Sequence, residues 1–162
     1  FYTKFIELAA EVNQAMPYHV VDLVGQALGH EGKPLDGAKI LILGVAFKPD
    51  VEDARNSPAE RIVELLLKRG ASVSYSDPYV ARYRVGRDVF CRDERWLERV
   101  DLSDGVLAES DCVIIVADHG SVDYAQVMQK APVIVDTRDA TRGLRGPARV
   151  IRVGAPQPQT GR

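Results

Sequence analysis

The sequence has little cysteine and no long hydrophobic run, and both shortages narrow what the protein can be. Of its 162 residues only Cys91 and Cys112 are cysteines, and neither stands in a C-x-x-C or other metal-ligand spacing. So few cysteines are typical of a reducing compartment. No apolar stretch approaches the roughly 18 to 20 residues that span a bilayer, and no signal-peptide pattern opens the chain. We therefore expect a reduced, cytoplasmic protein without a metal site or a membrane partner.

An excess of charge of one sign is also missing. The chain has 21 lysines and arginines against 23 aspartates and glutamates, which gives a formal net charge of -2. Proteins that bind nucleic acid or anionic membranes usually carry a basic excess. Neither partner is expected here, and any phosphate must be bound by a few basic side chains acting locally.

The first thirty residues have the spacing of amphipathic helices. Apolar side chains from Phe1 to Met16 fall on one stripe, and a second stripe runs from Val20 to Leu28. Pro17, between them, is expected to kink or restart the helix. The glycines and proline of residues 29–37 predict a linker. Because the chain opens inside a helical pattern without a methionine, we expect it to be a piece of a longer protein.

From Lys39 onward short apolar runs alternate with helical patterns. Strands are expected at 40–44, 73–75, 112–116, 133–135 and 150–153, and helices at 58–69 and 123–130. Continuous apolar runs are typical of strands buried on both faces of a parallel sheet. Residues 82–98 are charged and predict no regular element. The pattern predicts an α/β fold, a Rossmann-like doubly wound parallel sheet over residues 32–154, with a helical segment before it and a flexible tail at 155–162.

The loop after the first strand lacks the glycine fingerprint of a dinucleotide site. Residues 44–58 are Gly-Val-Ala-Phe-Lys-Pro-Asp-Val-Glu-Asp-Ala-Arg-Asn-Ser-Pro, and only Gly44 matches G-x-G-x-x-G. The backbone cannot then approach a pyrophosphate closely, so a standard NAD site is not expected. The loop offers Lys48 and Arg55 instead, beside a helix start that Ser57 can cap. Since ligands of such sheets bind at the carboxyl ends of strands, phosphate is the natural partner.

This loop resembles the hallmark of the C-terminal, UDP-binding domain of the UDP-glucose/GDP-mannose dehydrogenase family. Residues 5–17 resemble the end of that family's helical middle domain, and residues 70–79 resemble the next strand. The resemblance implies that residues 1–31 end a middle, dimerisation domain and that residues 32–154 bind a UDP-sugar. Residues 74–80, 117–124 and 135–138 look more like the UDP-N-acetylhexosamine branch of the family than the UDP-glucose branch.

The resemblance also implies roles for four residues. Lys48 would hold the UDP-sugar with Phe47 beside it, and Arg138 would contact the same ligand. Arg55 would reach across to NAD, which a preceding domain would mainly bind. Three cations could thus converge on one cleft. Ordinary ion pairs are the alternative, with Asp50, Glu52 or Asp53 for the first loop and with Asp136 or Asp139 for Arg138.

Two further polar residues and the cysteines receive no catalytic role. Asp77 precedes a proline and has no glycine fingerprint before it, so we expect a turn or cap. A lone histidine at a strand end, His119, is more often structural or on the surface. The family's catalytic cysteine lies in a Gly-Gly-x-Cys-Phe-Pro-Lys-Asp type motif that this sequence lacks. Cys112 is therefore expected in the core, and Cys91 has no assigned role.

Together these features predict the UDP-sugar-binding domain of an NAD-dependent dehydrogenase. The resemblance implies oxidation of the sugar's primary alcohol to a uronic acid for surface-polysaccharide synthesis, on UDP-N-acetylhexosamine or UDP-glucose. The chain alone is expected to be inactive, and a homodimer through the helical segment is expected. Two alternatives remain open, a stand-alone nucleotide-sugar-binding module and an α/β regulatory or interaction domain without a ligand.

Overall fold

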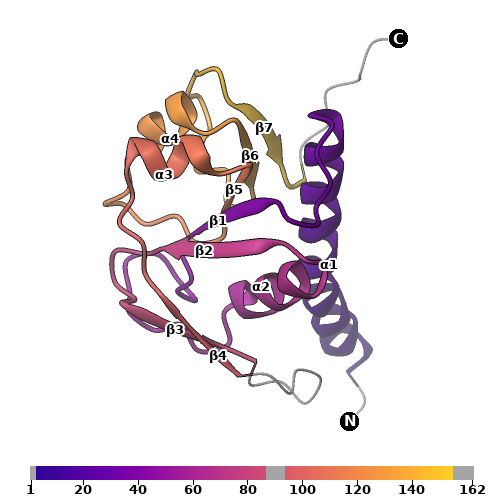
Figure 1. The fold of residues 1–162 in the computed structure, drawn as a ribbon. Coiled ribbons are helices and arrows are strands. Elements are labelled where there is room, and N and C mark those ends of the chain that lie inside the picture. The colour runs from indigo at the N-terminus through magenta and orange to yellow at the C-terminus, as the bar shows by residue number, and fades with distance from the viewer. Residues whose placement is uncertain (1–2, 87–93, 155–162) are drawn as a thin grey trace.

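A computed structural model describes residues 3–86 and 94–154 of the chain (Figure 1). In chain order the elements are α1 (Lys4–His30), β1 (Lys39–Leu43), α2 (Pro58–Lys68), β2 (Ser72–Ser76), β3 (Arg82–Val85), β4 (Arg95–Glu98), α3 (Asp104–Glu109), β5 (Cys112–Ile115), α4 (Tyr124–Lys130), β6 (Val133–Asp136) and β7 (Arg149–Arg152). The predicted tail and Cys91 lie outside the described residues. No helix within the described part is long and apolar enough to cross a bilayer.

Five strands form one parallel sheet in the order β2-β1-β5-β6-β7. Helices cover both of its faces, which confirms the predicted Rossmann-like α/β fold (Figure 1). The chain moves outward in one direction from β1 to β2 and in the other direction from β5 to β7. Loops that leave the carboxyl ends of β1 and β5 therefore diverge, and this switch point is where such sheets bind their ligands.

Each face of the sheet has its own hydrophobic core. On one face α1 and α2 pack against Ile40 and Ile114, and on the other face α3 and α4 pack against Leu41 and Ile115. Every residue of β1 and β5 except Lys39 is buried. Both faces of these strands need apolar side chains, and the continuous runs in the sequence follow from this.

The two apolar stripes that the sequence indicates in residues 1–28 belong to one long helix, α1, in the described part of the chain. The helix continues through Pro17, so of the two expected effects of the proline, a kink or a restart, the restart is wrong. A proline inside a helix removes one backbone hydrogen bond. The turns beyond it are stabilised because Val20, Val24 and Leu28 are buried against the sheet and α2. Tertiary packing therefore outweighs the local cost of the proline.

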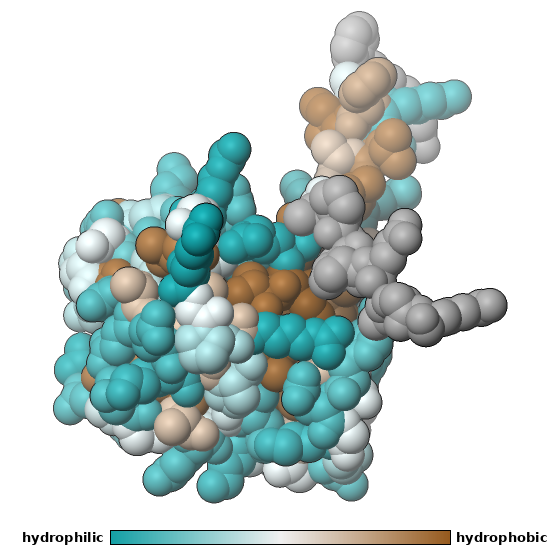
Figure 2. Space-filling model, turned by 90° about the horizontal axis from the view of Figure 1, so that it is seen from above, coloured by the Kyte–Doolittle hydropathy of each residue, from teal (hydrophilic) through white to brown (hydrophobic). Residues whose placement is uncertain are grey.

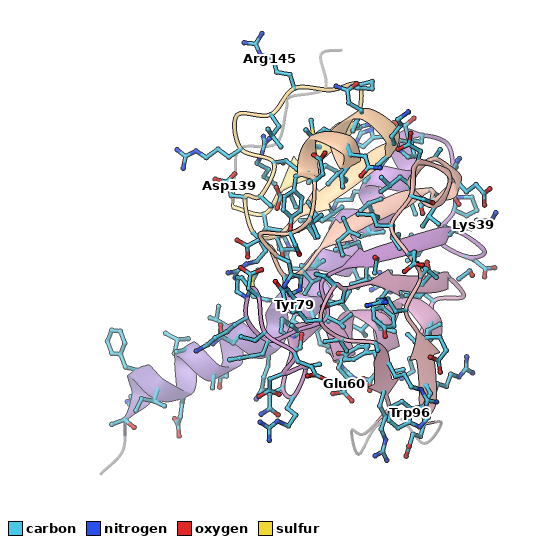
Figure 3. All side chains as sticks on the ribbon, turned by 90° about the vertical axis from the view of Figure 1, so that its left-hand side faces the viewer. Lys39, Glu60, Tyr79, Trp96, Asp139 and Arg145 are labelled. Atoms are coloured by element: carbon cyan, nitrogen blue, oxygen red, sulfur yellow. The ribbon has the colours of Figure 1, made fainter. Side chains whose placement is uncertain are left out.

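The N-terminal half of α1 projects away from the rest of the domain (Figures 2 and 3). Its apolar stripe is exposed, with Phe5 at 88% and Leu8 at 58% of full exposure. Ile6 and Val12 are exposed as well. Monomeric proteins rarely expose apolar side chains in such a row. The helix thus has a docked half after Pro17 and a projecting half before it.

Residues 82–98 were expected to be irregular, and in the described part this expectation is wrong. β3 and β4 form an antiparallel pair in which Arg84 lies opposite Trp96. The guanidinium groups of Arg82 and Arg84 lie 4.9 and 5.9 Å from the centre of the Trp96 ring. Tyr83, between the two arginines, is buried. Cation–π contacts and cross-strand pairs stabilise this exposed ribbon despite its charge.

The ends of α2 follow the predicted signals. The Ser57 hydroxyl oxygen accepts a hydrogen bond from the Ala59 amide, and Pro58 occupies the first helical position. Gly70, just beyond the helix, has a φ of 83°. This left-handed conformation favours glycine and ends the helix. The loop that precedes Ser57 is therefore fixed at its carboxyl end by a well-formed helix start.

Gly44 should be intolerant of any side chain. Its φ is 78°, and a Cβ atom there would lie 2.4 Å from the Ala117 carbonyl oxygen. We expect Gly44→Ala to lower the free energy of unfolding by about 2 to 4 kcal/mol, from backbone strain and overpacking together. Urea unfolding measures this change.

Gly25, within α1, is the matched control because a Cβ atom there meets nothing within 4 Å. Gly25→Ala should stabilise the protein by about 0.5 to 1 kcal/mol, since alanine is the better helix former. Equal effects of the two substitutions would contradict the close approach of the β1 and β5 loops.

Candidate functional site

A buried carboxylate, that of Asp77, lies where the loops after β1, β2 and β5 meet. The side chain is fully buried directly after β2. One carboxylate oxygen accepts hydrogen bonds from the amides of Val45 at 2.8 Å and Ala46 at 3.2 Å, and the other from Tyr79 at 2.8 Å and Val80 at 3.0 Å. The predicted turn role of Asp77 is confirmed. It extends further than predicted, because the same carboxylate also holds the β1 loop.

His119 completes this buried centre from the β5 loop. Its ring is fully buried, with Nε2 3.0 Å from the Asp77 carboxylate. The other ring nitrogen, Nδ1, accepts a hydrogen bond of 2.9 Å from the Asp50 amide. A neutral imidazole that accepts at Nδ1 carries its proton on Nε2 and donates it to Asp77. His119 is thus a structural link between two loops, as the sequence indicates.

Asp50 closes the network on the solvent side. Its carboxylate accepts hydrogen bonds from the Gly120 amide at 2.8 Å and from the Tyr79 hydroxyl at 3.2 Å. The Tyr79 ring packs against His119, with 5.1 Å between ring centres. Figure 3 shows Tyr79 at the edge of the sheet opposite Lys39, which begins β1. Three loops are therefore joined at the carboxyl edge of the sheet.

The amide donors keep Asp77 ionised inside the protein. Burial by itself would raise the pKa of the carboxyl, but the amides of Tyr79, Val45 and Val80, together with His119, outweigh it. The pKa of Asp77 is held below its usual value. A carboxylate that accepts several backbone hydrogen bonds is a strong acceptor and is costly to neutralise.

Phe47 and Lys48 lie exposed on the β1 loop, between the points held by Asp77 and by His119. Phe47 is 53% exposed. Its amide donates a 2.8 Å hydrogen bond to the Asp53 carbonyl oxygen, which closes the loop on itself. Within residues 3–86 and 94–154, Lys48 forms no ion pair with an acid. A fixed turn thus presents an exposed ring and an exposed cation.

Arg138, after β6, forms an ion pair with Asp118 in the β5 loop. The Arg138 Nε atom lies 2.9 Å from an Asp118 carboxylate oxygen, and the Arg138 side chain is 46% exposed. This partner differs from the two acids that the sequence suggested. Asp136 instead accepts hydrogen bonds from the Arg138 and Thr141 amides, and so shapes the turn. Both Arg138 and the Lys48 loop therefore flank the same segment, residues 118–120.

Arg55 lies in a different place. Its guanidinium makes two hydrogen bonds of 2.8 Å to Asp53, and its side chain is 80% exposed. These hydrogen bonds lower the pKa of Asp53 to about 2. Arg55 lines a cleft of about 900 Å³ beside the start of α2 and the β3–β4 hairpin. Figure 3 labels Glu60 and Trp96, which both line this cleft. Its described walls include neither Lys48 nor Arg138.

Cys112 lies in the core, as predicted. It is a free, fully buried cysteine of β5. Burial raises the pKa of its thiol to about 12. A thiol must ionise to act as a nucleophile, so Cys112 is inert at neutral pH.

Comparison with known proteins identifies the domain. The family model described as the UDP-binding domain of the UDP-glucose/GDP-mannose dehydrogenase family matches residues 41–143. The chain belongs to the UDP-glucose/GDP-mannose dehydrogenase family. The matched region includes all four predicted site residues, namely Phe47, Lys48, Arg55 and Arg138. The switch-point network of Asp77 and His119 lies within it as well.

Relatives in this family act on different nucleotide sugars. The UDP-N-acetyl-D-mannosamine dehydrogenase of Methanococcus maripaludis is 32% identical over 116 residues, which are 72% of this chain and 24% of that protein. The UDP-glucose 6-dehydrogenase TuaD of Bacillus subtilis is 28% identical over 144 residues, which are 84% of this chain and 29% of that protein. The chain thus spans less than a third of the length of these relatives.

A solved structure agrees with the family assignment. The UDP-D-ManNAc dehydrogenase from Pyrococcus horikoshii aligns with a TM-score of 0.75 at 25% identity, and the alignment covers 95% of this chain and 34% of that one. The alignment includes almost the whole described part of the chain. The match in structure and the match to the family model therefore both point to nucleotide-sugar dehydrogenases.

Two acids of the site were not predicted in their observed roles. The sequence indicates Asp50 only as an ion-pair partner for nearby cations, and it indicates no role for Asp118. A signal existed for both, because each lies in a loop that follows a buried strand, at the edge where ligands bind. Partners of Asp50 lie in the loop after β5, and the partner of Asp118 lies in the loop after β6. Spacing along the chain does not indicate such contacts.

Asp77→Asn should remove a pH-dependent part of the stability. The folded pKa of Asp77 lies below the unfolded value, so its contribution is present above about pH 4 and is lost as the pH falls through the folded pKa. At pH 7 we expect the variant to lose at least about 2 kcal/mol of unfolding free energy, because an amide offers its NH₂ group to backbone donors. Urea unfolding at pH 7 and pH 3 should show this gap narrowing in acid.

Asp101 provides the control for this measurement. Its side chain is 96% exposed, and Asp101→Asn should change the stability by less than about 0.5 kcal/mol at either pH. A gap between wild type and Asp77→Asn that stays constant from pH 7 to pH 3 would show that the Asp77 charge does not stabilise the fold.

Proposed function

We propose that this chain is the UDP-sugar-binding part of an NAD-dependent dehydrogenase that oxidises the sugar's primary alcohol to a uronic acid. The observation that carries the proposal is the placement of Lys48 and Arg138. They come from the loops after β1 and β6, and both loops contact residues 118–120 at the carboxyl edge of the sheet. A diphosphate carries two neighbouring negative groups, which cations from two loops that meet at one segment can bind together.

The observed ion pair of Arg138 does not prevent this role. An exposed pair such as Arg138–Asp118 contributes about 0 to 1 kcal/mol. A charge-assisted hydrogen bond to phosphate contributes about 1.5 to 3 kcal/mol. A ligand diphosphate can therefore replace Asp118 as the partner of Arg138. Phe47 is proposed to contact the same ligand through its exposed ring.

NAD is proposed to bind mainly to another domain of the enzyme. The β1 loop lacks the glycine fingerprint, and the contact that we propose from the described residues is the Arg55 guanidinium. It suits that contact because it is exposed and its pKa is raised by its hydrogen bonds to Asp53, so it stays charged. NAD supplies the hydride acceptor of such a reaction. Without the rest of the enzyme we expect no turnover, and no catalytic residue is proposed in this chain.

The sugar and the cellular setting are proposed from the resemblance and the relatives' names. UDP-N-acetylmannosamine is a named substrate of several similar proteins, and UDP-glucose of others. We propose a UDP-N-acetylhexosamine as the substrate, with UDP-glucose as the alternative. The uronic acid would serve surface-polysaccharide synthesis in the cytoplasm.

A homodimer is proposed through the projecting half of α1. The exposed stripe of Phe5, Ile6, Leu8 and Val12 is an apolar surface on a helix, and helices commonly pair through such stripes. Residues 1–31 are accordingly proposed to end a helical middle domain that continues before this chain. The docked half of the same helix would then connect the dimer to the UDP-sugar-binding domain.

Removing either cation of the proposed diphosphate site should weaken ligand binding. Loss of one charge-assisted hydrogen bond corresponds to a dissociation constant about 10- to 150-fold higher, and we expect this for UDP with Lys48→Ala and with Arg138→Ala. Isothermal titration calorimetry of the chain with UDP measures it.

Lys39→Ala and Arg145→Ala are the matched controls. Both side chains are exposed, and Figure 3 shows Lys39 and Arg145 away from Tyr79. They should leave the affinity for UDP unchanged within about twofold. If the folded wild-type chain ignored UDP at millimolar concentration, or if all four variants bound equally well, Lys48 and Arg138 would not form the site.

Arg55→Ala should act on the cofactor instead of the UDP-sugar. In the dehydrogenase that contains this domain, we expect a rise in the KM for NAD of about tenfold or more and little change in the KM for the UDP-sugar. Steady-state kinetics with each substrate varied in turn tests this. The opposite split between the two KM values would assign Arg55 to the sugar nucleotide.

A further inference from the structure

We propose that His119 is a positioning residue that fixes the turn carrying Phe47 and Lys48 for UDP-sugar binding. The inference rests on the proposed function, and it assigns a role to a side chain that touches no ligand itself. His119 connects the buried carboxylate of Asp77 with the backbone of Asp50, two residues after the exposed Lys48. Its ring contacts Asp77 on one side and the Asp50 backbone on the other.

The β1 loop is held on both sides of Phe47 and Lys48, and on the second side His119 binds the backbone. Before Phe47, the Val45 and Ala46 amides bind the Asp77 carboxylate directly. After Lys48, the Asp50 amide reaches the same carboxylate only through the His119 ring. The two exposed residues lie between these points. Their position relative to the sheet therefore depends on both anchors.

The second anchor compensates for an unfavourable backbone conformation. Asp50 has a φ of 59°, a left-handed conformation that costs a non-glycine residue about 1 kcal/mol or more. Its amide is bound to a ring nitrogen that is fully buried, where water is not an equivalent partner. The Asp50 carboxylate then accepts from the Gly120 amide. Without the His119 acceptor, the Asp50 side chain keeps its contacts with Gly120 and Tyr79, but the Asp50 backbone amide loses its partner.

The contacts of the two His119 ring nitrogens can be tested separately by replacing His119 with asparagine or with glutamine. Asparagine is short, and its carbonyl oxygen can take the place of Nδ1, accepting from the Asp50 amide. Glutamine is longer, and its NH₂ group can take the place of Nε2, donating to Asp77. His119→Asn thus keeps the anchor on the loop and loses the contact with Asp77. His119→Gln does the reverse.

The first measurement needs no ligand. Hydrogen exchange of the Asp50 amide is followed by NMR in the full 162-residue chain. This amide should remain protected in His119→Asn, and its exchange should become at least about tenfold faster in His119→Gln. Both variants should have a lower Tm than wild type, because each loses one buried hydrogen bond. A role in stability alone would change exchange in both variants in proportion to Tm.

The second measurement is the affinity for UDP by calorimetry. We expect His119→Asn to bind within about threefold of wild type and His119→Gln to bind about tenfold more weakly. If the wild-type chain binds UDP and the two variants bind it equally, the inference about His119 is wrong and the proposed function stands. If the folded wild-type chain does not bind UDP, the proposed function itself fails, and the exchange measurement still decides whether His119 fixes the turn.

Discussion

One ionised carboxylate, that of Asp77, organises the ligand-facing edge of this domain. It is fully buried and accepts hydrogen bonds from four backbone amides and one imidazole, which come from three different loops. A buried charge is costly unless hydrogen bonds replace its lost hydration, and here the donors are amides that would otherwise be unpaired. The carboxylate and the loops therefore stabilise each other. Removing either side would leave buried polar groups without partners.

This arrangement separates the residues that order the site from the residues that are proposed to bind the ligand. Asp77 and His119 are buried and fixed, whereas Phe47, Lys48 and Arg138 are exposed within a few residues of a fixed point. The close approach of Gly44 to Ala117 brings the β1 and β5 loops together at the switch point of the sheet. Long basic side chains can then adapt to a diphosphate while the backbone beneath them stays in place.

The sheet could be predicted from the sequence, whereas most contacts between loops could not. Runs such as residues 40–43 indicate buried strands because both faces of the sheet must be apolar, and Ser57-Pro58 is a local signal for a helix start. The hairpin of β3 and β4 was missed because its arginines pack on Trp96, so charge there does not indicate an irregular loop. The unbroken α1 and the Arg138–Asp118 pair depend on partners distant in sequence. Family resemblance implied the four proposed site residues, yet it indicated none of the hydrogen bonds that hold their loops.

The placement of Arg55 fits the proposal that one loop contacts two ligands. Lys48 and Arg55 are seven residues apart in a single loop, yet Lys48 follows the anchor at Asp77, while Arg55 precedes the α2 start capped by Ser57. Arg55 lines the cleft beside the β3–β4 hairpin, and the described walls of this cleft include neither Lys48 nor Arg138. In the proposed enzyme, the loop would contact the UDP-sugar near its beginning and NAD near its end. A loop fixed at both ends can keep these two contacts at a constant separation, and hydride transfer between two bound molecules requires a constant separation.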